Sequence, residues 1–290
     1  GTFTVDAKII LDYISLLPNQ KVDIKKKEKE LQVSSDNYKT NIKGVEADDF
    51  PLIPQIERET SFKIKQKDFK KAISQVIFAA ASSESRIELS GVLFKLDKNN
   101  LTSAATDSYR LGEKKVELTS PNKNQEGFTI IVPTKALQEV VRVISSMKSN
   151  IEGESEEVEI LISENQILFI LNNTEITSKL VEGQYPDYQQ IIPVSNNTRA
   201  VISKEELVRA VKVASIFSRS GVNDVNIDLP ANGSKMVISS TSGQTGENVT
   251  ELAASVSGKD NSIVINHRYL LDGLNNIEEE NVVLEVTDGN

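Results

Sequence analysis

Ten lysine and arginine side chains in three short segments are the residues of this sequence whose chemistry is easiest to recognise. The segments cover residues 65–80, 134–148 and 204–217, and each holds more basic than acidic residues. Together they carry a net charge of +6 in a chain of net charge −9, so the remaining residues carry −15. One basic helix alone is usually a solvated face. If the three segments share a surface, however, the bias predicts a polyanionic partner bound through charge alone.

Side chains that could support catalysis or hold a cofactor are sparse. The single histidine, His267, cannot build a zinc site or a proton relay by itself, and we expect a structural role for it. The acidic runs 154–157 and 278–280 are typical of solvated patches. The segment 243–246 lacks the lysine and the strand–helix setting of a phosphate-binding loop, and no serine lies in a nucleophile elbow. The sequence therefore predicts no catalytic residue, no cofactor and no metal.

The basic segments belong to a repeated pattern of secondary structure. Five β-rich runs, at residues 3–5, 62–64, 128–132, 200–202 and 263–265, each precede apolar residues at helical spacing. In the second of these, the apolar spacing continues from Phe69 to Ala80. Strand-like runs such as 91–96, 158–162 and 166–171 follow the helices, separated by turn residues. The unit is one strand, one helix and about three antiparallel strands. By itself it exposes the apolar stripe of its helix and one face of its sheet, so neighbouring units must cover both.

Pairs of these units repeat in turn. Val5, Val132 and Ile265 take the same place in alternate units, 127 and 133 residues apart, and Phe69 and Leu207 are matched 138 residues apart. A domain is therefore two units, or roughly 130 residues. On this pattern the first helix belongs to the second half of a domain whose first half is absent. The last unit stops one strand after its helix, so we expect a chain cut at both ends.

Composition places the chain among ordinary globular proteins. It has 290 residues, 38% of them hydrophobic and 26% charged, and no cysteine. Without cysteine neither a disulfide framework nor a thiolate metal site can form. The N-terminal residues do not resemble a secretory signal, and no apolar run approaches membrane length. We therefore expect a cytoplasmic protein.

Two motifs give the sequence a family resemblance. Residues 105–111 read Ala-Thr-Asp-Ser-Tyr-Arg-Leu, and residues 178–188 read Ser-Lys-Leu-Val-Glu-Gly-Gln-Tyr-Pro-Asp-Tyr. Both closely resemble patterns of the bacterial DNA sliding clamps, the beta subunits of the replicative DNA polymerase III. The resemblance covers essentially the whole chain, and Ser218 and Tyr269 fall at expected places later in it.

The resemblance implies an α+β DNA-clamp fold of repeated β-α-β-β-β half-domains, with helices lining the interior of a ring and antiparallel sheets outside. Residues 1–60 would be the second half of clamp domain I, residues 61–193 the complete domain II, and residues 194–290 a domain III lacking its C-terminal strands. It also implies a non-catalytic processivity factor that encircles duplex DNA. The DNA-facing residues it implies are Lys65, Lys67, Lys70, Lys71, Arg86, Lys135, Arg142, Lys204, Arg209 and Lys212.

A peptide groove between domains II and III is the second site that the resemblance implies. In the family it binds short tails of the polymerase alpha subunit, the clamp loader, repair polymerases and mismatch-repair proteins. The matching positions are Leu89, Thr106, Ser108, Tyr109, Arg110, Leu111, Pro186, Gln190, Ile191, Val222, Asn266 and Tyr269. Gln190 stands where some members have arginine. Without the resemblance, Leu89, Leu111, Ile191 and Val222 would be interpreted as core residues.

The family also implies a head-to-tail homodimer. Positions matching its interface are Ile10, Tyr13, Thr40 and Ile42 in the first domain, and Ile216 and Phe217 in the third. Since parts of both domains are expected to be absent, we predict that this chain alone does not close stably on DNA.

Two other classes of protein remain as alternatives. An extracellular carbohydrate-binding β-module predicts aromatic platforms, but tryptophan is absent and aromatic residues make up 5% of the chain. A nuclease or polymerase subunit with its own active site predicts acidic residues clustered at strand ends with a metal, and no such cluster is evident.

Overall fold

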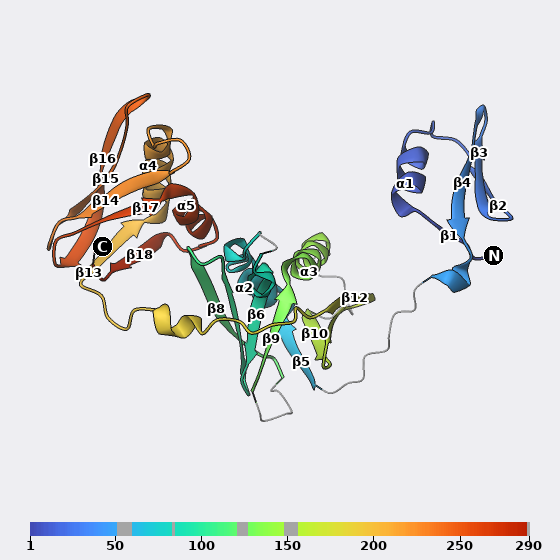
Figure 1. The fold of residues 1–290 in the computed structure, drawn as a ribbon, viewed down its shortest axis with the longest axis horizontal. Helices are drawn as coiled ribbons and strands as arrows, with labels where there is room; N and C mark the ends of the chain where they lie inside the picture. Colours follow the sequence, from blue (N-terminus) through green and yellow to red (C-terminus); the bar gives the residue numbers. More distant parts are fainter. Residues whose placement is uncertain (51–59, 83–84, 121–126, 148–155, 289–290) are drawn as a thin grey trace. The chain divides into compact units, whose positions relative to one another are not determined.

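The chain folds into two compact units in the computed structural model, Gly1–Gln55 and Ile56–Asn290 (Figure 1). The structure describes residues 1–50, 60–82, 85–120, 127–147 and 156–288. Among these residues, no helix combines the length and the apolar character needed to span a bilayer.

The repeated pattern predicted from the sequence is confirmed, because each helix follows a strand and three strands follow each of the first four helices. The helices are α1 (Ala7–Ser15), α2 (Gln66–Ser74), α3 (Thr134–Ser146), α4 (Lys204–Ile216) and α5 (His267–Asn275). The strands are β1 (Thr4–Val5), β2 (Asp23–Lys27), β3 (Glu30–Ser35), β4 (Tyr38–Val45), β5 (Thr60–Lys65), β6 (Gly91–Leu96), β7 (Asn100–Thr106), β8 (Leu111–Glu117), β9 (Phe128–Pro133), β10 (Glu157–Ile162), β11 (Gln166–Leu171), β12 (Thr174–Lys179), β13 (Thr198–Ser203), β14 (Asp224–Leu229), β15 (Lys235–Ser242), β16 (Gly246–Gly258), β17 (Asn261–Asn266) and β18 (Asn281–Val286).

Side chains just before the helices fix where three of them begin. Asp6 accepts hydrogen bonds from the backbone N–H groups of Lys8 and Ile9, at 2.8 and 2.9 Å. Ser203 caps α4 and Asn266 caps α5 in the same way. Each cap satisfies a backbone donor that has no partner inside the helix.

One predicted helix is shorter than its apolar spacing indicates. The spacing continues to Ala80, but α2 ends at Ser74, and a 3-10 helix, η2 (Ile77–Ala79), follows. Between them Val76 leaves helical geometry, with φ at −125°, and its side chain is fully buried. The helix therefore breaks where Val76 enters the core. The spacing of apolar residues in the sequence does not reveal this break.

The N-terminal unit is one four-stranded antiparallel sheet beside α1. The strand order is β1-β4-β3-β2, so β2 is an edge strand. Among the described residues of this unit, the buried apolar side chains are Val33 on β3 and Ile42 on β4. With two such residues, the unit has a small core.

Residues 60–179 of the C-terminal unit exchange strands between their two halves. The strand before each helix pairs with the strand that follows the other helix, β5 with β10 and β9 with β6. This gives two four-stranded sheets, ordered β12-β11-β10-β5 and β8-β7-β6-β9. The buried side chains of α2 and α3, including Phe69, Ile73 and Leu137, join strands of both sheets in a single core. The halves therefore fold as one body.

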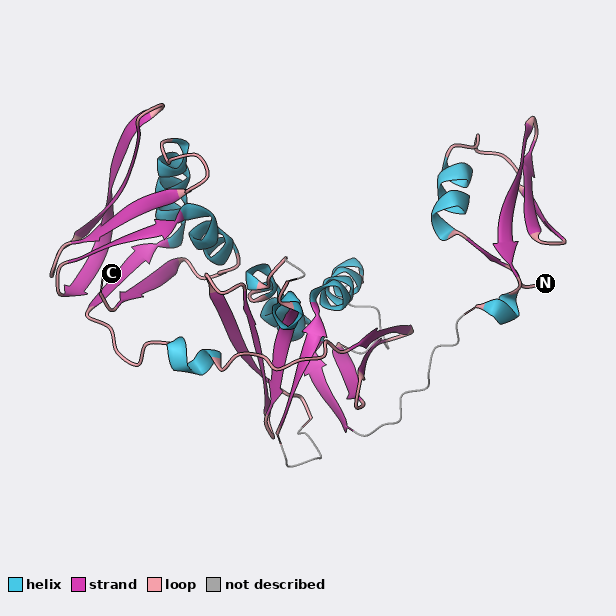
Figure 2. Ribbon diagram, in the orientation of Figure 1, coloured by secondary structure: helices cyan, strands magenta, loops and turns pink. Residues whose placement is uncertain are grey.

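Residues 198–286 form a six-stranded sheet, ordered β17-β14-β15-β16-β13-β18. Its core includes Leu207, Val211 and Leu274 from α4 and α5. Figures 1 and 2 show α2, α3, α4 and α5 on the same side of the C-terminal unit, with strands extending below α2 and α3 and lying beside and below α4 and α5. The basic segments predicted on α2, α3 and α4 thus share a side of this unit.

Candidate functional site

The turn between β7 and β8 is held by its own polar side chains. Asp107 accepts hydrogen bonds from the backbone N–H groups of Tyr109 and Arg110, at 3.0 and 3.1 Å, and from Nε of Arg110 at 3.1 Å. Thr106 Oγ1 donates to the carbonyl oxygen of Arg110 at 2.6 Å. Ser108 takes a positive φ of 78°, which side-chain-bearing residues rarely adopt. The turn therefore presents Tyr109 and Arg110 in a fixed direction.

Arg110 joins this turn to α5. Its guanidinium donates to a carboxylate oxygen of Asp272, and its central carbon lies 4.7 Å from the ring centre of Tyr269 and 5.6 Å from that of Phe78. The rings of Tyr109 and Tyr269 stack with centres 6.4 Å apart and an interplanar angle of 27°. A planar guanidinium suits both the carboxylate and the aromatic faces. We call this cluster of Tyr109, Arg110, Tyr269 and Asp272 the Arg110 seam.

The residues predicted to line a groove differ widely in exposure. Tyr109 is 82% exposed, Ile191 69% and Val222 51%, so their side chains are available to a partner. Leu89 and Thr106 are buried, and the backbone N–H of Thr106 donates a hydrogen bond to the Tyr185 hydroxyl at 3.0 Å.

The remaining predicted groove residues have local structural contacts. Leu111 packs half-buried against a small cluster that includes Leu93. Gln190 and Pro186 are exposed, and Nε2 of Gln190 donates to Asp187 at 2.8 Å. Asn266 is the N-cap of α5, and Ser108 Oγ accepts a hydrogen bond from Arg86 at 3.0 Å. The structure brings together the Arg110 seam, whereas the role of the complete set stays a prediction.

A second set of contacts links α2 to the segment after α5. Lys71 Nζ lies 2.7 Å from a carboxylate oxygen of Glu278 and 3.7 Å from one of Glu279. The hydrogen bond to Glu278 raises the pKa of the Lys71 ammonium. Gln75 Nε2 donates to the carbonyl oxygen of Asn276 at 2.9 Å. Part of the acidic run 278–280 is therefore paired with the basic helix α2. The sequence had predicted that this run is a solvated patch.

Of the residues predicted to face DNA, several are engaged locally. Arg142 pairs with Glu139, and Arg209 pairs with Glu205 at 2.6 Å. Lys204 Nζ donates to the carbonyl oxygen of Ile277 at 2.7 Å. Within the part of the chain that the structure describes, no ion pair is seen for Lys65, Lys67, Lys70, Lys135 and Lys212. Lys148 of the second basic segment lies outside the described residues.

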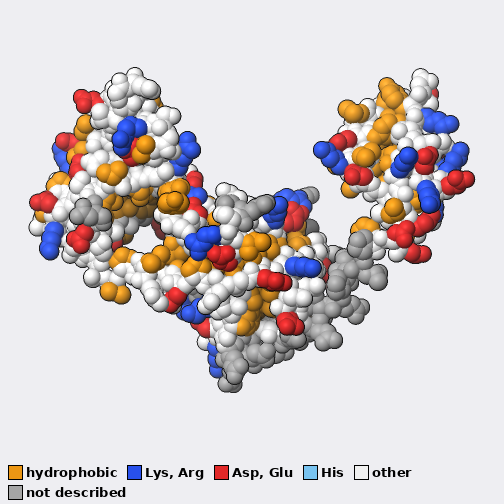
Figure 3. Space-filling model, in the orientation of Figure 1, with side chains coloured by type: hydrophobic (Ala, Val, Ile, Leu, Met, Phe, Trp, Pro, Cys, Tyr) orange, Lys and Arg blue, Asp and Glu red, His pale blue; other side chains and the backbone are white. Residues whose placement is uncertain are grey.

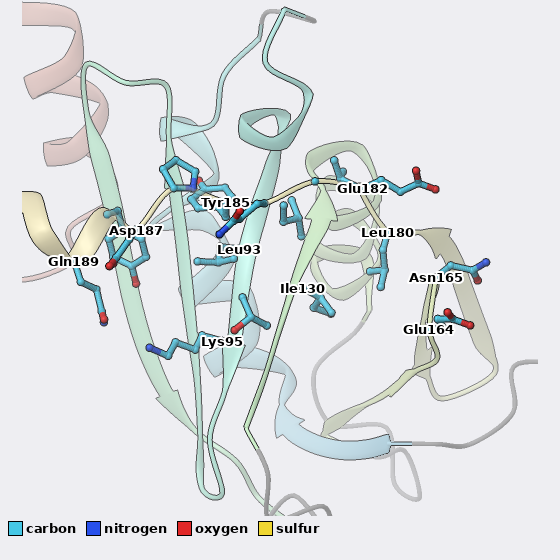
Figure 4. Close-up of a pocket in the computed structure, with 17 residues that line it drawn as sticks. Leu93, Lys95, Ile130, Glu164, Asn165, Leu180, Glu182, Tyr185, Asp187 and Gln189 are labelled. Carbon is cyan, nitrogen blue, oxygen red and sulfur yellow. The ribbon is translucent and has the colours of Figure 1, made fainter.

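A cavity of about 640 Å³ lies on the sheet side of residues 91–189 (Figure 4). Figure 4 shows Leu93, Ile130 and Leu180 along it, between Asp187 and Gln189 at one end and Glu164 and Asn165 at the other. Of the predicted groove residues, Pro186 lines this cavity, together with Tyr185 and Tyr188. Burial raises the pKa of Tyr185 to about 12, and burial together with its bond to Glu113 raises the pKa of Tyr188. These tyrosines anchor the segment that carries Pro186.

The other predicted positions are also placed. Ile10, Tyr13 and Thr40 are half-buried and Ile42 is buried in the N-terminal unit, whereas Ile216 is 66% exposed and Phe217 half-buried in the C-terminal unit. His267 begins α5, and burial lowers the pKa of its imidazole. Among the described residues, no group of three or more His, Asp or Glu side chains could hold a metal ion.

Sequence reasoning missed Asp272 of the seam, and also Asp107 and Phe78, which contact Arg110 beside it. Asp107 lies inside one of the motifs that carry the family resemblance, so that motif could have drawn attention to it. Asp272 has the same place on its helix as Glu139 and Asp12, but its pairing with Arg110 spans 162 residues. No local pattern encodes a contact at that separation.

Comparison with known proteins agrees with this geometry. Residues 63–187 match the family described as DNA polymerase III beta subunit, central domain, and residues 189–290 match its C-terminal domain. The "Beta sliding clamp" of Staphylococcus aureus is 31% identical over 287 residues, covering 98% of this chain and 73% of that protein. That of Staphylococcus epidermidis is 30% identical over the same length.

Solved structures show the same likeness. The DNA polymerase sliding clamp from Bacillus subtilis aligns with a TM-score of 0.88 at 29% identity, covering all of this chain and 74% of that one. The DNA polymerase III subunit beta from Pseudomonas aeruginosa aligns with a TM-score of 0.87 at 27% identity, covering 76% of its chain. A further structure of the Pseudomonas aeruginosa clamp contains bound griselimycin.

Proposed function

Because the chain belongs to the bacterial beta sliding clamps, the accessory beta subunits of DNA polymerase III, we propose that one side of its C-terminal unit faces duplex DNA and that its Arg110 seam docks partner peptides. We further propose that residues 1–60, 61–193 and 194–290 correspond to clamp domains I, II and III. The family matches at residues 63–187 and 189–290 support the last two divisions.

The proposed DNA-facing side carries α2, α3 and α4. Lys67, Lys135 and Lys212 are exposed on these helices and could approach phosphates. Such contacts position a protein on a duplex without reading its sequence, so the clamp could slide. We include Lys65 and Lys70 in this set. We expect Lys71, Arg86, Arg142 and Arg209 to contribute less because carboxylates already pair with them, and Lys204 because its ammonium donates to a backbone carbonyl oxygen.

The Arg110 seam is the observation that carries the proposed peptide groove. It places an exposed aromatic ring, Tyr109, over Tyr269 at the junction of residues 61–193 and 194–290. Exposed apolar side chains at Ile191 and Val222 supply further contact area. Aromatic and arginine side chains of this kind are enriched where a short peptide obtains most of its binding energy. The proposed partners are tails of the polymerase alpha subunit, clamp loader, repair polymerases and mismatch-repair proteins.

For assembly, we propose the head-to-tail homodimer of the full-length family. Exposed Ile216 and half-buried Phe217 would meet Ile10, Tyr13, Thr40 and Ile42 of a second copy. Ile216 is 66% exposed, and so large an exposed apolar side chain supports a contact with a second copy at this position.

A labelled peptide of the type Gln-Leu-x-Leu-Phe tests the groove. We expect the 290-residue chain to bind it, and we expect Tyr109→Ala to weaken the binding at least tenfold because a central aromatic contact is lost. Fluorescence anisotropy measures both affinities. Tyr38→Ala, which removes a half-exposed tyrosine from the N-terminal unit, is the control and should bind as the unmodified chain does. Equal binding by Tyr109→Ala and the unmodified chain would contradict the proposed groove.

A further inference from the structure

The cavity in Figure 4 lies apart from the Arg110 seam, because none of the seam residues lines it. Its wall includes Leu93 and Ile131, which face each other on β6 and β9 and are 6% and 5% exposed. Ile130 and Leu180 also line it and are half-buried. Figure 3 shows hydrophobic side chains gathered over this part of the C-terminal unit. The cavity therefore offers an apolar surface large enough for a bound segment or ligand.

One side of the cavity is the edge of a sheet. Strand β9 is the last strand of its sheet and pairs with β6. On its other side, the backbone N–H of Val181 donates to the carbonyl oxygen of Ile131 at 2.9 Å. In an antiparallel pair, alternate residues direct both backbone groups to the same side. Thr129, two residues before Ile131, therefore directs its N–H and C=O away from β6.

The segment after β12 leaves this edge before it reaches Thr129. Val181 lies in that segment, and two residues later the chain bends at Gly183, where φ is 136°. Within the described part of the chain, no backbone hydrogen bond joins Thr129 to a segment other than β6. Thr129 is exposed and lines the cavity. An unpaired strand edge of this kind is a template for a further extended segment.

The charges around the cavity favour a basic occupant. Its lining contains three carboxylates, those of Glu164, Glu182 and Asp187, and one ammonium, that of Lys95, which gives a net charge of −2. All four side chains belong to exposed residues. Among the described residues, no ion pair is seen for any of them. A positively charged segment would therefore meet carboxylates that have no competing cation.

We propose that this cavity binds an extended segment of a partner protein that carries lysine or arginine on either side of small apolar residues. The segment adds to the edge of β9 through the backbone groups of Thr129. Its apolar side chains cover Leu93 and Leu180, and its basic side chains approach Glu164 and Glu182. Main-chain hydrogen bonds with side-chain pockets are the usual way in which a strand is added to a sheet. The site is separate from the Arg110 seam and goes beyond the proposed function.

A fluorescein-labelled peptide, Lys-Thr-Val-Thr-Val-Thr-Lys, tests the site on the 290-residue chain by fluorescence anisotropy. We expect saturable binding that weakens with salt, because the cavity's charged groups are exposed. The matched peptide Glu-Thr-Val-Thr-Val-Thr-Glu should bind at least about tenfold more weakly, since it meets like charges. Equal affinities for the two peptides, or no saturable binding of the first up to about 1 mM, would overturn the proposal.

Charge variants locate the binding. Glu164→Gln should weaken binding of the basic peptide about threefold, as for the loss of one exposed ion pair. Glu247→Gln is the matched control, because Glu247 is equally exposed but lies on β16 and does not line the cavity. It should bind as the unmodified chain does. The same loss in both variants would show that the peptide follows overall charge, and would refute the site.

Backbone changes test the strand addition itself. Thr129→Pro removes the outward N–H, at a position where an edge strand tolerates proline, and should weaken binding about fivefold. Thr129→Ala keeps that group and should cost clearly less. A peptide N-methylated at its central residues tests the same hydrogen bonds without altering the protein, and it should also bind about fivefold more weakly. Full affinity of the N-methylated peptide would exclude strand addition.

Competition separates this site from the proposed groove. An excess of unlabelled Gln-Leu-x-Leu-Phe peptide should not displace the labelled basic peptide, and Thr129→Pro should bind the Gln-Leu-x-Leu-Phe peptide as the unmodified chain does. Displacement would assign the basic peptide to the groove and overturn the second site. If the groove peptide fails to bind at all while the basic peptide binds as expected, the proposed groove fails and the cavity site stands.

Discussion

One side chain, Arg110, connects two parts of the C-terminal unit that are far apart in sequence. It holds Asp107 within its own turn, Asp272 on α5, and the faces of two aromatic rings. Its side chain is 19% exposed, so these partners replace most of its water. The planar guanidinium of Arg110 fixes the relative positions of these carboxylates and rings as well as balancing charge. A lysine ammonium lacks the planar, forked arrangement of N–H donors and would not reproduce these contacts. The peptide site proposed here depends on that geometry, because Tyr109 is the adjacent residue.

Two tyrosines below the seam give the first prediction, a loss of stability at high pH. Burial disfavours the phenolate and raises the pKa of Tyr185 from its ordinary value of 10.0 to about 12 in the folded chain. Its contribution to stability is therefore complete below pH 10 and is lost progressively as the pH rises to about 12. We expect the free energy of unfolding, measured with urea between pH 8 and 11, to fall less steeply for Tyr185→Phe than for the unmodified chain.

Tyr38→Phe is the matched control for that measurement, since Tyr38 is 49% exposed. Its pH profile should coincide with that of the unmodified chain. Tyr188→Phe should flatten the profile too, because burial and Glu113 raise the pKa of Tyr188. Parallel profiles for Tyr185→Phe and the unmodified chain would show that this phenol does not couple folding to pH.

At the scale of elements, strand exchange makes residues 60–179 a single folding body. Phe69 on α2 contacts Phe94 on β6, with ring centres 6.2 Å apart, and Phe169 on β11, with centres 5.8 Å apart. These two strands belong to different sheets, so Phe69 joins the halves through one buried ring. Phe69 is the fourth residue of α2. The fourth residue of α3, α4 and α5 is a leucine, namely Leu137, Leu207 and Leu270, so this helix position accepts either phenylalanine or leucine.

We expect Phe69→Ala to destabilise the C-terminal unit by about 3–5 kcal/mol, the range for truncating a buried phenylalanine. Phe69→Leu should cost clearly less, because leucine fills the equivalent position of three other helices. Urea unfolding measures both. Val249→Ala, at an exposed site of the same unit, should change stability by less than about 0.5 kcal/mol. Similar costs for alanine and leucine at residue 69 would contradict the repeat-based argument.

At the scale of the whole molecule, charge is segregated against an acidic background. The chain carries a net charge of −9, yet three of its helices carry a surplus of positive charge. Lys67 and Lys71 lie on the same helix and differ in their surroundings. Lys67 is exposed, whereas Lys71 is held by Glu278 and Glu279. A phosphate must compete with these carboxylates for Lys71, so the two lysines should differ in their contribution to DNA binding.

We expect Lys67→Ala to lower the affinity for duplex DNA of any sequence and to reduce the slope of log K against log salt by about 1, as for one lost phosphate contact. Lys71→Ala should change that slope by less. Titration of labelled linear duplexes at several salt concentrations measures both slopes. A larger change for Lys71→Ala than for Lys67→Ala would contradict the assignment of Lys67 to the DNA-facing side.

The amino-acid sequence by itself determined the order of elements, the repeat and the family resemblance. These features depend on local periodicity and on short motifs, which can be read within a few residues. The groove, DNA and dimer residues could be named only through that resemblance, and their roles stay predictions.

Tertiary structure decided what local pattern does not contain. The exchange of β5 and β9 between half-domains, the early end of α2 at Val76 and the pairing of Lys71 with Glu278 all depend on contacts between distant residues. Lys71 and Glu278 are 207 residues apart. Whether a lysine on an amphipathic helix stays free or meets a carboxylate is decided by which elements pack beside it, and packing is set only when the whole unit has folded.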